Sequence, residues 1–166
     1  GSESEIFKLE VLMKKAGVTV HDRKVVDAAL SYAEETGAPA AALELDNGKM
    51  ILGKTSDLLG ALSAVLLNAL KELAGIDHEL PLISPSALEP IQKLKTMYFG
   101  SRNPRLHMEE VLIALSSSTE SNPLADLALR QLPNLRGSQV HTSRMLSAAD
   151  EKTFQKLGVM LTSEAK

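Results

Sequence analysis

The chain has 166 residues, of which 44% are hydrophobic and 23% charged, as is typical of one globular domain. Its 18 Lys and Arg residues against 21 Asp and Glu residues give a net charge of −3, so no global attraction favours nucleic acid or an anionic membrane. The absence of cysteine excludes disulfides, thiolate zinc sites and cysteine nucleophiles, and suits a reducing compartment.

The first elements in chain order are helical. Residues 1–2, a Gly-Ser pair, have the composition of a tag remnant and are left out of the fold. Apolar side chains at helical spacing predict a helical extension over residues 3–19. Residues 20–166 are predicted to form a single domain, which begins with a helix that ends before Gly37.

A β-hairpin is predicted next. Residues 40–45 and 49–53 have strand-forming composition and flank Asn47-Gly48. Asn-Gly favours a type I′ turn, because both central residues of that turn need a positive φ. We therefore expect a tight antiparallel hairpin at this point of the chain.

Residues 48–55 also match the phosphate-loop pattern G-x-x-x-x-G-K-[ST]. That chemistry needs a wrapped loop with backbone N–H groups directed at phosphate oxygens, which a paired hairpin excludes. Even in the hairpin, Lys54, Thr55 and Ser56 would lie at a strand end before a helix N-terminus, where anions commonly bind. The segment is therefore a candidate anion site under either interpretation.

The remaining elements alternate between helix and strand. Ser86 with Glu89 and Ser147 with Asp150 have capping-box spacing. The predicted helices are 57–74, 87–99, 105–117, 124–131 and a last one before Gly158. Ser86 caps the helix 87–99, and the pairs Asn103-Pro104 and Asn122-Pro123 open the helices 105–117 and 124–131. The predicted strands are 80–84, 139–144 and 159–162. This order predicts an α/β fold, a three-layer α/β/α sandwich with a mostly parallel sheet and an N-terminal antiparallel hairpin.

Few other residues suggest chemistry. Ser84, Ser86 and Lys93 would lie near the start and end of the next helix, and they join Lys54 to Ser56 as candidate ligand-binding residues. The four histidines are scattered and no nucleophile with a base can be named, so we predict no catalytic residue, no metal site and no cofactor. Five arginines lie in the second half of the chain: Arg102, Arg105, Arg130, Arg136 and Arg144. They could form a surface for an anionic partner or simply a solvated face.

The predicted order of elements resembles that of cytidine-deaminase-like domains. Those enzymes hold zinc through a His or Cys at the start of the central helix and through P-C-x-x-C at the start of the next. Here the two positions fall near Ser63 and on residues 85–89, where there is no thiolate and no histidine. The resemblance therefore implies the fold without deaminase activity.

A closer resemblance rests on longer runs of sequence, namely residues 53–56, 58–61, 83–85, 89–95 and 103–107. These are similar to the C-terminal part of the bacterial proteins grouped as domain of unknown function family 1846. The resemblance implies a cytoplasmic bacterial protein whose full-length members are longer and carry an additional N-terminal α/β region. The family has no established reaction, so it provides no catalytic residues.

Two functions follow as hypotheses. The first is a non-catalytic accessory or assembly domain, which would pack against the N-terminal region of its own full-length chain or form a homo-oligomer, with no membrane or nucleic-acid partner. The second is a site for a nucleotide or another small anion at the carboxyl edge of the sheet around Lys54 to Ser56.

Overall fold

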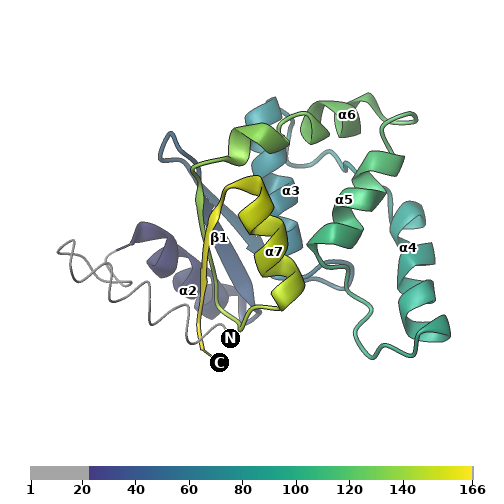
Figure 1. The fold of residues 1–166 in the computed structure, drawn as a ribbon, viewed down its shortest axis with the longest axis horizontal. Helices are drawn as coiled ribbons and strands as arrows, with labels where there is room; N and C mark the ends of the chain where they lie inside the picture. Colours follow the sequence, from purple (N-terminus) through teal and green to yellow (C-terminus); the bar gives the residue numbers. More distant parts are fainter. Residues whose placement is uncertain (1–22, 166) are drawn as a thin grey trace.

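The computed structural model describes residues 23–165, in which helices surround one four-stranded sheet (Figure 1). In chain order the elements are α2 (Lys24–Thr36), β1 (Ala40–Glu44), β2 (Met50–Lys54), α3 (Ala61–Ala74), α4 (Pro85–Lys93), the π-helix η2 (Leu94–Tyr98), α5 (Met108–Ser117), α6 (Pro123–Leu129), the 3₁₀-helix η3 (Leu132–Leu135), β3 (Gln139–Thr142), α7 (Ala148–Leu157) and β4 (Met160–Ser163). The predicted tag remnant and helical extension lie outside the described residues. Within 23–165, no helix has both the length and the apolarity that a membrane span requires.

The sheet is mixed. Its order is β2-β1-β3-β4; β1 is antiparallel to both β2 and β3, and β3 is parallel to β4. The prediction of a mostly parallel sheet is therefore wrong. Residues 80–84, expected to add a strand, form a loop. Pro81 and Pro85 flank the buried Leu82 and Ile83, and a proline cannot donate to a strand ladder, so this apolar run is buried without pairing.

The hairpin of β1 and β2 is confirmed, and its strands pair antiparallel over all five residues of each. Its turn is not type I′, because the only described residues with positive φ are glycines, which excludes Asn47. The N–H of Gly48 donates to the carbonyl of Leu45 at 2.8 Å, and the N–H of Leu45 donates to that of Lys49 at 2.9 Å. The result is a three-residue loop that ends on a left-handed glycine.

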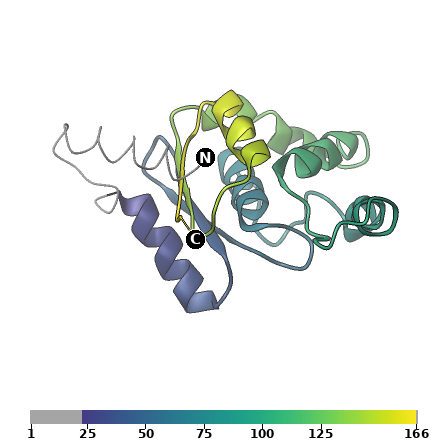
Figure 2. The same ribbon diagram turned by 60° about the horizontal axis from the view of Figure 1, so that its bottom comes forward.

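Helices lie against both faces of the sheet (Figure 2). On one face, α2 packs over β1, with Val25, Val26 and Ala29 buried against Ala42. On the other face, α3 packs over β1 and β2, and α7 packs beside β4. The second face carries the larger core, which extends outwards to α5 and α6.

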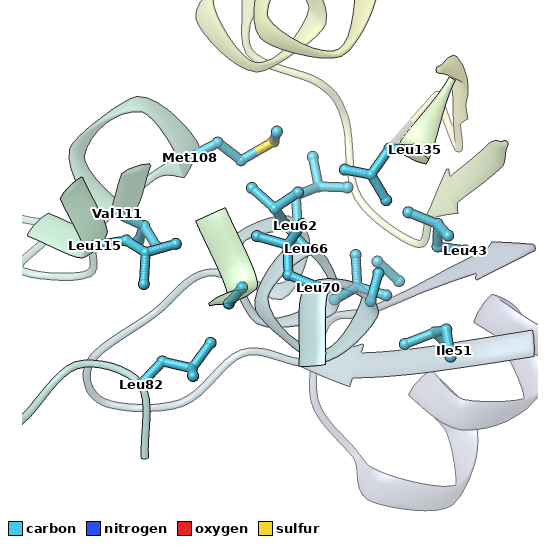
Figure 3. Close-up of a cluster of buried hydrophobic side chains, with 14 of the residues drawn as sticks. Leu43, Ile51, Leu62, Leu66, Leu70, Leu82, Met108, Val111, Leu115 and Leu135 are labelled. Carbon is cyan, nitrogen blue, oxygen red and sulfur yellow. The ribbon is translucent and has the colours of Figure 1, made fainter. Parts of the chain in front are cut away.

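The larger core is drawn in Figure 3. It joins side chains of the hairpin, of α3 and of α5, among them Leu43, Ile51, Leu62, Leu66, Leu70, Met108, Val111 and Leu115. The backbones of β2 and α3 approach each other closely at Gly53. A Cβ placed there would lie 2.4 Å from the backbone nitrogen of Val65, so the position excludes any side chain.

The helix predicted over 87–99 starts two residues earlier and ends differently. Ser84, and not Ser86, occupies the N-cap of α4, and the helix begins at Pro85. Its last turn is the π-helix η2, where the N–H of Phe99 donates to the carbonyl of Leu94 at 3.1 Å. A π-turn widens the helix locally and is frequent at functional sites.

The two Asn-Pro pairs behave differently. Asn122 caps α6 as predicted, because its side chain accepts an N–H from the first turn. Asn103 instead accepts the N–H of Arg105 at 3.0 Å within a turn, and α5 begins only at Met108. Between this turn and the start of α5, Leu106 forms an isolated parallel bridge to Leu59, in the segment before α3, and the bridge keeps the chain extended there.

Candidate functional site

Residues 48–55 adopt the hairpin and not the wrapped loop of a phosphate-binding motif. Both glycines of the pattern have structural roles: Gly48 takes a φ of +89° in the turn, and Gly53 permits the approach of α3. The N–H groups of an extended strand alternate in direction and do not converge on one point. After the strand, the N–H of Thr55 donates to the carbonyl of Pro39 at 2.9 Å. The motif therefore lacks the geometry of a phosphate cradle.

The six residues predicted to bind a ligand are not brought together. Thr55 lines a cleft, described next, and the other five lie outside its lining. Lys54 is exposed at the end of β2, and the Ser56 carbonyl is engaged by Arg105. The Ser84 and Ser86 hydroxyls face each other at 3.0 Å on the surface at the start of α4, and Lys93 is exposed at its end.

A cleft of about 420 Å³ opens where three helices begin. These helices, α3, α5 and α7, lie side by side on the same face of the sheet (Figure 1). Most of the lining comes from three separate segments: the start of α3, the stretch from η2 to α5, and the connection from β3 to α7. Pro39, just before β1, and Thr55, just after β2, complete it, so the cleft is formed by residues from 39 to 150 and by no single motif.

The N-terminus of α3 is both buried and uncapped. Gly60 occupies the N-cap and offers no side chain, and the first turn contains no acidic residue. The N–H groups of Ala61, Leu62 and Ser63 have no acceptor within the helix, because they belong to its first turn. All three residues are buried and line the cleft, Ser63 with only 1% of its surface exposed. The positive end of the α3 dipole therefore faces the cleft without compensation.

The N-termini of α5 and α7 are supplied with acceptors. The N–H of His107, at the N-cap of α5, donates to the Glu110 carboxylate at 3.1 Å. The N–H of Met108 points to the Asp150 carboxylate at 3.5 Å. The Ser147 hydroxyl accepts the N–H of Asp150 at 3.1 Å and caps α7, as the sequence predicted. Of the three helix ends, that of α3 is the one left open.

Three basic residues line the same cleft. Lys95 belongs to the π-helix η2, and its ammonium group is held by Glu110 at 2.8 Å and by the Arg105 carbonyl at 2.6 Å. Arg105 is anchored through Nε, which donates to the Ser56 carbonyl at 2.6 Å. Neither Arg105 nor Arg144 makes an ion pair within the described part of the chain. The Arg144 guanidinium and the two Nη groups of Arg105 thus have no acidic partner among the described residues and can bind an anion in the cleft.

The cleft has the chemistry of a binding site and offers no obvious catalytic pair. Its histidine, His107, lies 3.4 Å from Glu110 at the surface, and the two serines of the lining have structural bonds: Ser63 donates to the Leu106 carbonyl, and Ser147 caps α7. Within residues 23–165, no group of three or more His, Asp or Glu side chains could hold a metal ion. What the lining provides is positive charge and N–H donors, which suit an anionic group.

Arg105 and Arg144 are among the five arginines noted in the sequence, but the sequence assigns them to no site. A signal was present: α3 begins with Gly60 and Ala61, with neither a polar N-cap nor an early acidic residue, although it is a strongly apolar helix. A second signal is the absence of Asp and Glu from residues 90–108, which contain two lysines and two arginines. Neither signal indicates which helix ends meet.

A second polar cluster lies on the α2 face of the sheet. Arg23 donates to the side chains of Gln139 at 2.8 Å and Thr162 at 3.0 Å. His141, fully buried, bonds the Thr162 hydroxyl at 2.7 Å and the Glu164 carboxylate at 3.0 Å. Burial lowers the pKa of Arg23, against the raising effect of a nearby carboxylate. The cluster connects the start of α2 to β3 and β4, and none of its residues lines the cleft.

Comparisons with known proteins give a family and no reaction. A family described as “Domain of unknown function DUF1846, C-terminal” matches residues 21–166. A UPF0371 protein of Corynebacterium glutamicum is 55% identical over 159 residues, which are 96% of this chain and 32% of that relative. A second from Corynebacterium efficiens is 57% identical with the same coverage. A third from Streptococcus uberis is 50% identical over 160 residues, again 96% of this chain and 32% of the relative. The chain thus spans about a third of the length of these relatives.

Proposed function

Given that the chain belongs to the family described as “Domain of unknown function DUF1846, C-terminal”, we propose that it binds a small anionic ligand in the cleft between α3, α5 and α7. One observation carries the proposal: the buried and uncapped N-terminus of α3 faces a cleft that also holds Arg105 and Arg144. Buried N–H groups are almost always paired, so an unpaired set at a cleft suggests a ligand. The ligand group is a phosphate or a carboxylate.

The energetics favour such a group. A helix N-terminus stabilises a partly buried anion by up to about 2 kcal/mol, and a guanidinium group can hold phosphate or carboxylate through two parallel hydrogen bonds. The volume of about 420 Å³ is in the range of sites for small metabolites. Asp150 lines the cleft and Glu110 lies beside it, but both carboxylates already accept N–H groups at the start of α5, and Lys95 pairs with Glu110.

The direct test is calorimetric titration with inorganic phosphate, pyrophosphate and citrate, carried out on matched variants at Gly60. A Cβ at this position would lie 4.0 Å from its nearest neighbour, so a side chain fits. Gly60→Asp places a carboxylate on the free N–H groups and should weaken binding at least about tenfold, which corresponds to 1.4 kcal/mol. Gly60→Ser supplies a neutral cap, and we expect a smaller loss.

Two further variants locate the site. Arg105→Gln removes a charge that lines the cleft, and Lys54→Gln removes one at the hairpin end, outside the lining. We expect the first to weaken phosphate binding and the second to leave it unchanged. Binding lost only in Lys54→Gln would return the site to the segment predicted from the sequence. Absence of binding by all three probes would end the proposal.

Three expectations from the sequence stay predictions beside this proposal. The first is that the domain is a non-catalytic accessory part of a longer protein, in keeping with its coverage of 32% of the relatives. The second is a cytoplasmic location. The third is kinship with cytidine-deaminase-like domains, which the strand order β2-β1-β3-β4 with β1 antiparallel supports. Of the two positions compared with the zinc site of those domains, Ser63 lines the cleft and residues 85–89 do not.

A further inference from the structure

A cluster of apolar side chains is exposed at the end of η2. The exposed fraction is 68% for Met97, 72% for Tyr98 and 75% for Phe99, and Leu94 is exposed as well. We refer to Met97, Tyr98 and Phe99 as the aromatic ridge. The chain contains two tyrosines, three phenylalanines and no tryptophan, so two of its few aromatic residues are adjacent in solvent. By contrast, Phe154 is fully buried in the core.

The aromatic ridge is held in place by backbone hydrogen bonds. The N–H of Phe99 donates to the carbonyl of Leu94 at 3.1 Å, and the N–H of Ser101 donates to that of Lys95 at 2.9 Å. Gly100, with a φ of +71°, permits the sharp reversal between them. A rigid cluster of exposed Met, Tyr and Phe has the composition of the centre of a protein interface, where few side chains provide most of the binding energy.

We infer that the aromatic ridge is the surface on which the preceding region of the longer natural protein docks. The chain corresponds to about a third of its relatives, and it matches a family described as C-terminal, so about two thirds of such a protein would precede it. Lys95, in the same π-turn, lines the cleft from the other side of this segment. Docking on the aromatic ridge would therefore place the preceding region against one wall of the cleft, as is common for ligand sites between domains.

Charge argues against a second copy of this chain as the occupant. No acidic residue occurs in residues 90–108, and Lys93 and Arg102 are exposed on either side of the aromatic ridge. A two-fold contact would bring the same basic surface of each copy together, which like charges oppose. The surface instead fits a partner that is apolar at its centre and acidic at its rim.

Thiol labelling can test this inference, because the chain contains no cysteine. Met97→Cys places one thiol on the aromatic ridge, and Glu35→Cys places one at an exposed position of α2, which lies on the opposite side of the molecule from α4 (Figure 2). Each variant is prepared in the 166-residue chain and in a chain of the relatives' full length that ends with these residues. Alkylation is followed for each peptide by mass spectrometry.

We expect the thiol at position 97 to be alkylated at least about tenfold more slowly in the long chain, and the thiol at position 35 equally fast in both. Adding Tyr98→Ser and Phe99→Ser to the long chain should restore fast labelling at position 97. Equal rates at position 97 in the two chains would overturn the inference. The inference would also be overturned if the thiol at position 97 of the short chain became protected as the concentration of that chain rises, which would indicate self-association. Protection that appears only with phosphatidylglycerol vesicles would overturn it as well, because it would indicate a membrane surface. The labelling requires no anion, so its result is independent of the proposed function.

Discussion

The helices α3 and α7 begin at the same cleft, and their first turns are stabilised in different ways. α7 starts at Ser147, whose hydroxyl caps the helix, and it carries Asp150 and Glu151 in its first turn. α3 starts at Gly60 with no side-chain acceptor and no acidic residue, and it is held by core packing and by hydrogen bonds from the Gly60 N–H and the Ser63 hydroxyl to the Leu106 carbonyl. Residues of the local sequence thus supply an acceptor for the first turn of α7. Tertiary contacts fix the position of the start of α3 and leave the N–H groups of its first turn without a side-chain acceptor.

The largest expected effect concerns the packing that positions α3. Gly53→Ala would place a Cβ 2.4 Å from the backbone nitrogen of Val65 and 2.7 Å from its Cα, and backbone atoms cannot move aside cheaply. We expect the free energy of unfolding to fall by about 3 kcal/mol, the upper end of ordinary overpacking. Urea denaturation followed by circular dichroism measures the loss.

Gly60→Ala is the matched control for that variant. Its new Cβ would meet only the Leu106 carbonyl at 4.0 Å, an ordinary contact. The expected change in the free energy of unfolding is below about 1 kcal/mol, because glycine and alanine differ modestly at an N-cap. Equal losses in the two variants would show that close backbone approach does not position α3.

The same contrast explains which parts of the fold the sequence predicted. The hairpin turn and the caps at Asn122 and Ser147 depend on residues within a few positions of each other, and local patterns located them. The start of α5 was misplaced because Asn103, a good cap by composition, serves a turn instead. The strand predicted at residues 80–84 is wrong because a short buried apolar run has the same sequence pattern in a strand and in a packed loop.

The candidate site was harder to predict than the fold. Of the residues proposed from the sequence, Thr55 lines the cleft, because the choice rested on one segment and its motif. The other contributors, such as Arg105 and Arg144, are brought there by three helix starts that are far apart in the chain. Which ends converge depends on the strand order, and the strand predicted at 80–84 is not part of the sheet.

A smaller effect is expected where local capping supports the helix. Ser147→Ala removes the acceptor for the N–H of Asp150 and should lower the free energy of unfolding by about 1 kcal/mol. Ser117→Ala, at the exposed last turn of α5, is the control, and we expect a change of less than about 0.5 kcal/mol. Thermal unfolding of both variants in one buffer is sufficient. If Ser147→Ala lowered the free energy of unfolding no more than Ser117→Ala, the Ser147 cap would not be what stabilises the start of α7.

The smallest effect gives α3 the kind of acidic group that α7 already has. In phosphate-free buffer at low salt, the carboxylate of Gly60→Asp would compensate the helix dipole and should raise the free energy of unfolding by about 0.3 to 1 kcal/mol. With phosphate at about 100 times its dissociation constant, the unsubstituted chain gains about 2.7 kcal/mol from ligand binding, whereas a variant that binds about tenfold more weakly gains only about 1.4 kcal/mol. The order of stability should therefore reverse when phosphate is added. A variant that stays more stable at every phosphate concentration would show that the open end of α3 is not a ligand site, because a helix end left free for an anion must lose that anion when the chain supplies its own.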